Sequence, residues 1–195
     1  MKNILLTTAL VFAGTAAMAA DFDNNTVDLT LERDNLTFGI STLAGEATDL
    51  SVNVTVLPYA VMGAEADLTL GAEYGIQSED FTLSATYALS KNYNQLNVYG
   101  SVEAAYTIES GADEGAWDAT PTVGAAYRVN DKFSAFSEVA YTWDASNDWT
   151  PDGGTVEAGA RYAINDDVAL TSSLVRSFDT GADETNLNVE VALRF

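Results

Sequence analysis

Apolar and polar residues alternate with a period of two over most of the chain from Leu36 onward. Leu68 and Leu70, for example, share one face of their segment, while Thr69 and Glu73 share the other. A period of two is that of a β-strand whose two faces meet different surroundings. No segment shows an amphipathic helical pattern of useful length. We therefore expect an all-β fold.

The alternating segments indicate an antiparallel up-and-down β-barrel. Signals for eight strands lie between residues 64 and 195, and a pair at 35–43 and 50–58 brings the count to ten. Residues 26–31 could add another strand, but transmembrane barrels of this kind usually have an even number. We expect ten strands, with eight or twelve as alternatives. The expected barrel therefore covers residues 35–195, and residues 20–34 are an N-terminal extension or a short strand.

Residues 1–19 have the layout of a secretory signal peptide. Lys2 supplies a positive start, residues 4–13 are apolar, and Ala17-Met18-Ala19 matches an A-x-A cleavage site. The apolar part is shorter than the roughly 20 residues that a membrane-spanning helix needs. We expect an exported chain that is either soluble or inserted in a membrane as strands.

The alternation fits either a soluble barrel with its apolar face inward or a membrane barrel with its apolar face outward. The connections favour the membrane barrel. Short polar turns at 130–132 and 165–167 alternate with longer acidic loops at 109–118, 144–153 and 179–184. Short turns on one side and long loops on the other are typical of outer-membrane barrels.

The outward aromatic residues also favour a membrane barrel, because they fall near the two ends of the expected strands. The group near the short turns is Tyr87, Tyr127, Phe133, Tyr162 and Phe195, and the group near the loops is Tyr74, Phe81, Tyr106, Tyr141, Trp143 and Phe178. Small or aliphatic residues such as Val102 and Leu170 lie between them. A soluble core would place its large aromatic residues in mid-strand.

The last segment alternates up to Leu193 and Phe195 and ends in an aromatic residue. A signal peptide, a meander of strands and a terminal Phe resemble the small Gram-negative outer-membrane barrels of the OmpA/OmpX type. The resemblance is one of pattern, and no family-specific residue motif is matched. It implies a transmembrane barrel in the bacterial outer membrane, contact with outer-membrane lipid, and recognition of Leu193 and Phe195 by the outer-membrane assembly machinery. We expect a monomer.

The composition excludes several classes of function. The formal charge is −21, so the chain cannot offer the basic surface that nucleic acid needs. It has no His and no Cys, which removes His-based catalysis, thiol nucleophiles and His or Cys metal sites. Asp and Glu alone could support glycoside chemistry, but no cleft is recognisable. We expect no enzyme activity and no cofactor.

Charged residues on the polar face are candidates for a lumen network. They are Arg128, Arg161, Arg194, Glu73, Glu103, Glu138, Glu157 and Glu190. The main hypothesis is a side-chain-filled plug in which Arg161 bridges Glu138 and either Glu157 or Glu190. The alternative is a narrow cation-preferring pore, supported by the small residues Gly71, Gly124 and Gly159. A water-filled lumen would leave Arg161 as a weak, exposed ion pair.

Acids in the longer loops could weakly bind divalent cations through oxygen ligands, although none has the spacing of a calcium loop. They are Asp113, Glu114, Asp118, Asp144, Asp148, Asp152, Asp179, Asp183 and Glu184. We predict no resident metal. Three functions follow from the sequence. The favoured one is a structural or surface-interaction barrel of the outer membrane. The alternatives are a small passive porin-like channel and a soluble periplasmic ligand-binding barrel.

Overall fold

The computed structural model describes residues 26–33, 36–43, 46–55, 59–61, 63–112, 114–178 and 184–194. The strands are β1 (Thr26–Arg33), β2 (Leu36–Leu43), β3 (Glu46–Thr55), β4 (Tyr59–Val61), β5 (Ala64–Gly75), β6 (Phe81–Tyr93), β7 (Leu96–Ile108), β8 (Ala116–Arg128), β9 (Phe133–Asp144), β10 (Thr150–Ala163), β11 (Val168–Phe178) and β12 (Thr185–Arg194). No helix in these residues is long and apolar enough to cross a membrane. The expected signal peptide and Phe195 lie outside the described residues.

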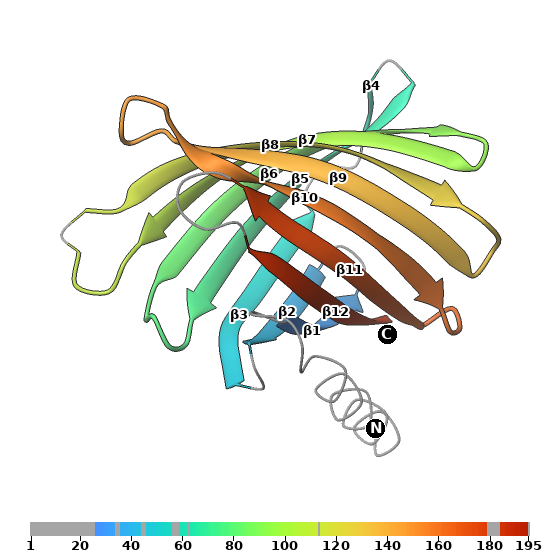
Figure 1. Ribbon diagram of the computed structural model, residues 1–195, viewed down its shortest axis with the longest axis horizontal. Helices are drawn as coiled ribbons and strands as arrows, with labels where there is room; N and C mark the ends of the chain where they lie inside the picture. Colours follow the sequence, from blue (N-terminus) through green and yellow to red (C-terminus); the bar gives the residue numbers. More distant parts are fainter. Residues whose placement is uncertain are drawn as a thin grey trace.

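The strands form one closed β-barrel (Figure 1). The sheet runs in the order β3-β2-β1-β12-β11-β10-β9-β8-β7-β6-β5, and pairing of β3 with β5 closes it. Neighbouring strands are antiparallel at every junction except one, where β1 and β12 run parallel. The expected all-β barrel is confirmed, and its topology is a meander with a single parallel seam.

The barrel has eleven strands in the described residues, so the preferred count of ten is one short. The additional strand is β1, which contains the segment 26–31 that we expected to be an extension. It pairs with β2 from Thr26 to Arg33 and with β12 from Thr26 to Glu32. The even-number rule did not anticipate it, because a parallel seam lets an odd number of strands close.

Strands β3 and β4 both pair with β5, one after the other along its length. β3 pairs with β5 as far as Thr55 opposite Thr69, and β4 resumes with Tyr59 opposite Ala66. Figure 1 shows β4 projecting beyond the barrel wall next to β5. It therefore extends one hairpin and does not add a wall strand.

The connections fall into two groups at opposite ends of the barrel. Among the described connections, the turn end carries the short ones at 94–95, 129–132 and 164–167, and the loop end carries those at 76–80 and 145–149 and the described parts of 109–115. Two short turns are built alike, because Asn130 Oδ1 accepts a hydrogen bond from the Lys132 amide and Asn165 Oδ1 accepts one from the Asp167 amide. Such Asx turns explain why similar Asn-Asp sequences recur at both places.

The apolar face of the strands points outward. Val123, Val102 and Leu70 remain 64%, 52% and 47% exposed, whereas Ser173 on the opposite face is only 5% exposed. No large side chain among the described residues is fully buried. Over most of the described strands the outer face is therefore apolar and exposed and the inner face polar. The exception is β12, where Val189 and Val191 are only 6% and 5% exposed.

The outward aromatic residues form contacts at the loop end. The rings of Tyr106 and Trp117 are 4.9 Å apart, and Tyr141 lies 4.7 Å from Trp143 and 6.2 Å from Phe178. Tyr74 stands opposite Phe81 in register.

At the turn end the outward aromatics are Tyr127, Phe133 and Tyr162, and one expected member is misplaced. Tyr87 is the middle residue of β6, since this strand continues to Tyr93. The polar residues from Lys91 to Tyr93 belong to β6, so the strand runs well beyond Tyr87. Tyr93, 54% exposed, is the aromatic residue at that edge.

Candidate functional site: the barrel lumen

Carboxylates from seven different strands line the interior, and we call this set the acidic ring. It consists of Asp28, Asp49, Glu73, Glu103, Glu138, Glu157 and Glu190. Each lies on the face opposite the apolar residues of its strand, which are exposed on most of these strands but buried at Val189 and Val191 of β12. The strands that contribute them, β1, β3, β5, β7, β9, β10 and β12, are spread around the whole barrel.

The members of the acidic ring act on one another electrostatically. Glu73 feels the charges of Asp49, Glu103 and Asp28. Asp28 in turn feels Glu190 and Asp49.

The chain of like charges continues on the other side of the barrel. Glu157 feels Glu138, Glu190 and Asp28, and it stands directly opposite Glu138 in the β9–β10 register. Like charges placed opposite each other across two strands repel. The ring therefore concentrates negative potential around the lumen.

Polar neutral side chains provide the hydrogen bonds to the ring. The Thr86 hydroxyl donates to Glu103 Oε2 over 3.0 Å, and the Tyr99 hydroxyl donates to Glu138 Oε2 over 2.8 Å. Ser173 bonds to Glu157. Hydroxyl groups satisfy carboxylate oxygens but leave the negative charge uncompensated.

The inward arginines lie at the turn end, away from most of the ring. Arg194 pairs with Glu32 over 3.2 Å, and its side chain is 65% exposed. Arg128 and Arg161 form no ion pair within the described part of the chain. Exposed pairs of this kind contribute about 0–1 kcal/mol, so they do not hold the barrel together.

The expected bridge from Arg161 to Glu138 is wrong. In the β9–β10 register Arg161 stands opposite Ser134, four residues along the strand from Glu138, or roughly 13 Å at strand spacing. Thr171 lies on its other side, between it and Glu190. The bridge was expected because the depths of the two residues in the barrel were counted from two different turns. Such a count leaves out the stagger between neighbouring strands that barrel closure imposes.

Two aromatic rings that the sequence analysis missed fill part of the interior beside β8 and β10. The ring of Tyr99 lies across Gly124, with Gly124 between Tyr99 and Glu138 in register. Phe136 covers Gly159 in the same way, and a Cβ there would lie 2.7 Å from its ring. These glycines therefore make room for rings, and they do not widen the lumen as the alternative of a narrow pore supposed.

Gly71 faces Asn53 and Ser84, whose side-chain oxygens would collide with a Cβ at this position. The missing side chain of Gly71 therefore also leaves room for neighbouring side chains. Asp28 and Asp49 were also missed as ring members. Alternation with the outward Leu50 would have placed Asp49 inside, but Asp28 became an interior residue only when β1 was seen to belong to the wall.

Two hollows open at the ends of the lumen. At the loop end a cavity of about 340 Å³ is lined by inward residues that include Thr120, Thr142 and Ser177. At the turn end a cavity of about 190 Å³ is lined by residues that include Arg161 and Arg194. The wall of the turn-end cavity is mainly polar, whereas the loop-end cavity has a mixed wall that also includes Ala140 and Phe178.

The loop acids do not gather into a metal site in the described part of the chain, where no group of three or more Asp or Glu side chains could hold an ion. Asp118 stands opposite Asp144 at the loop end. Asp113, Asp179 and Asp183 lie outside the described residues. Weak binding of divalent cations stays a prediction.

No family model matches the chain, and no curated protein is significantly similar to it in sequence. The functional argument therefore depends on the barrel and its lumen alone.

Proposed function

We propose that the protein is an integral barrel of the bacterial outer membrane whose water-filled lumen passes small cations. The observation that carries this proposal is the acidic ring, which encircles the lumen without a paired arginine among the described residues. Rings of Asp and Glu are a common device for cation selectivity. Unpaired carboxylates are too costly to keep in a dry interior, so they require water around them.

The outer wall supports the membrane location. Its large apolar residues are widely exposed, and aromatic residues gather at both ends of the strands. A hydrocarbon layer would remove this surface from water, and barrels without free edges are one of the two structures that can cross it. The same exposed wall opposes a soluble periplasmic ligand-binding barrel, whose apolar face would point inward.

The width of the barrel supports a conducting lumen. A barrel of about eight strands is just wide enough for side chains to fill, and diameter grows with strand number. Eleven strands enclose more space, while Tyr99 and Phe136 occupy only the side near β8 and β10. We therefore expect a narrow channel and not a wide porin.

Planar-bilayer recording tests this proposal. The refolded protein is first checked for heat-modifiable gel migration and for insertion into vesicles. It is then expected to give stable single-channel current steps. An inserted barrel that produces no steps would contradict the conducting lumen.

A structural barrel with a closed lumen is the second candidate. It is favoured by the Tyr99–Glu138 hydrogen bond and by the ring of Phe136 over Gly159, which narrow the interior. In that case the protein would serve envelope integrity or surface interaction. Absence of current from a correctly inserted barrel is the result it predicts.

A further inference from the structure

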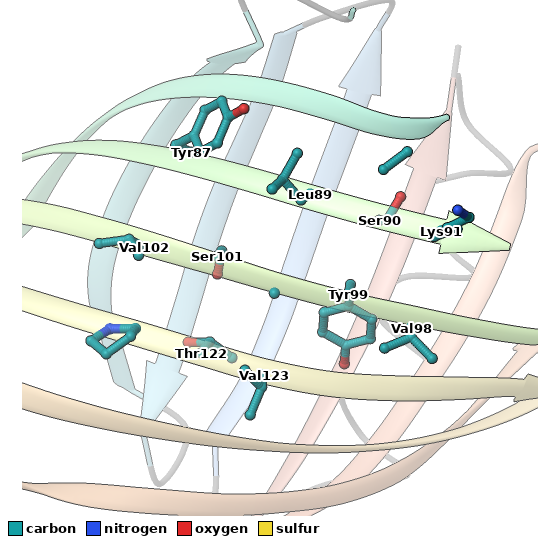
Figure 2. Close-up of a pocket in the computed structure, with 13 residues that line it drawn as sticks. Tyr87, Leu89, Ser90, Lys91, Val98, Tyr99, Ser101, Val102, Thr122 and Val123 are labelled. Atoms are coloured by element: carbon teal, nitrogen blue, oxygen red, sulfur yellow. The ribbon is translucent and has the colours of Figure 1, made fainter. Parts of the chain in front are cut away.

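A groove interrupts the outer wall of the barrel across β6, β7 and β8. It has a volume of about 510 Å³, and Figure 2 shows the side chains that surround it. Its outward-facing wall residues are Tyr87, Leu89, Val98, Val102, Pro121 and Val123. Gly100 forms the floor, because it stands between Leu89 and Val123 in register and has no side chain to fill the space.

The groove is elongated in the direction of the strands. Three cross-strand rows contribute to it: Lys91 with Val98, Leu89 with Gly100, and Tyr87 with Val102. Four residues of strand span roughly 13 Å. The hollow is therefore long, narrow and almost wholly apolar, which is the shape of a site for a hydrocarbon chain.

A positive charge lies at the turn end of the groove. Lys91 is exposed, and its Nζ lies 5.6 Å from the centroid of the Tyr93 ring. Lys91 forms no ion pair with any carboxylate in the described part of the chain, and it is the outward-facing cation on the β5–β8 wall. In a chain with a net charge of −21, this lysine is a local exception to the acidic surface.

We propose that the groove binds one anionic phospholipid of the periplasmic leaflet, with an acyl chain over Gly100 and the headgroup phosphate at Lys91. This inference rests on the proposed membrane location, in which the turn end faces the periplasm. Apolar walls bury the chain, and Lys91 lies where strand β6 approaches the leaflet surface. A Lys near a membrane surface attracts anionic lipid by about fivefold in affinity.

Gly100 offers a direct way to remove the site. A Cβ at this position would meet only Thr122 O at 3.4 Å and Val123 Cγ1 at 3.8 Å, which are ordinary contacts. The Cβ of Gly100→Leu therefore fits without a clash, and the rest of the leucine side chain should extend into the groove. Ala104→Leu is the matched control, because Ala104 is also exposed on the outer face of β7 but does not line the groove.

The test measures the lipid that stays bound to the inserted protein. Each variant is refolded in vesicles of phosphatidylglycerol and phosphatidylcholine, extracted in mild detergent, and weighed by native mass spectrometry. We expect one retained phosphatidylglycerol on the native chain and on Ala104→Leu, and loss of it from Gly100→Leu. Val98→Phe, which fills the groove from its side wall, should lose it as well and covers the case in which Gly100→Leu fails to insert.

Lysine variants test the headgroup part of the proposal. Lys91→Gln should lose the roughly fivefold preference for phosphatidylglycerol over phosphatidylcholine, while Lys132→Gln, at the exposed turn between β8 and β9, should keep it. Equal preference in the two variants would overturn the role of Lys91.

Three further results would overturn the site itself: no retained lipid on the inserted native protein, equal retention by Gly100→Leu and Ala104→Leu, or a second copy of the chain in place of lipid. Heat-modifiable migration is recorded for every sample. Failure of the native chain to insert would count against the proposed membrane location, and failure of lipid retention by an inserted barrel would count against the groove alone.

Discussion

Replacing Glu157 by Gln is expected to stabilise the barrel, although it alters an inward-facing charged residue. Glu157 stands opposite Glu138, and directly opposed side chains have Cβ atoms about 4.5–5.5 Å apart. Two carboxylates about 6 Å apart repel by about 0.7 kcal/mol in water and about 3 kcal/mol at an effective dielectric constant near 20. Gln retains a group that can bond to Ser173, so the gain should be about 0.7–3 kcal/mol.

Reversible urea unfolding in lipid vesicles, followed by tryptophan fluorescence, measures this change in the free energy of unfolding. Glu65→Gln is the matched control, because Glu65 is exposed on the inner face at the turn end of β5 and outside the ring. It should stay within about 0.5 kcal/mol of the native chain. High salt should shrink the gain of Glu157→Gln. A loss of about 3–5 kcal/mol would refute the argument, since that is the cost of breaking a buried ion pair.

Four other substitutions test three separate predictions in the same unfolding titration. Arg161→Ala should change stability by only about 0–1 kcal/mol, as for an exposed residue without an ion pair, and a cost of about 3–5 kcal/mol would restore the plug. Val102→Arg on the outer wall should cost about 2–4 kcal/mol and Ser101→Arg in the lumen less, and equal costs would contradict the assignment of faces. Tyr99→Phe should cost about 1.5–3 kcal/mol through the lost hydrogen bond to Glu138, and no change would mean that water replaces it.

The faces of the strands could be predicted from the sequence because they depend only on a period of two. Once Leu70 points outward, Thr69 and Gly71 must point inward, whatever strand lies beside them. This reasoning placed every predicted member of the lumen set on the interior side. The expected aromatic residues of the described strands also lie on the outer face, whereas Phe195 lies outside the described residues.

Register could not be predicted in the same way. Which residue of β9 stands opposite Arg161 depends on the stagger between two strands, and stagger is set by closure of the whole barrel. A slip of four residues separates Ser134, the actual neighbour, from Glu138, the expected one. The sequence therefore identified the charged residues of the lumen but not their partners.

The parallel pairing of β1 with β12 could not be predicted for a different reason. Residues 26–33 join the barrel wall only because they pair with β12. The sequence of either segment alone indicates a strand but does not show that the two strands pair. That pairing brings Asp28 beside Glu190 and adds one carboxylate to the ring. The acidic ring depends on closure of the barrel, because only the closed barrel brings carboxylates from strands far apart in the sequence around one lumen.

The reversal potential of single channels across a salt gradient tests the central claim most directly. With potassium chloride about tenfold more concentrated on one side, the native chain should show a reversal potential of the sign that marks potassium as the preferred ion. Joint replacement of Glu138, Glu157 and Glu190 by Gln should move it toward zero while current steps persist. A reversal potential that marks chloride as the preferred ion, or one that this triple change leaves unaltered, would contradict the role of the acidic ring.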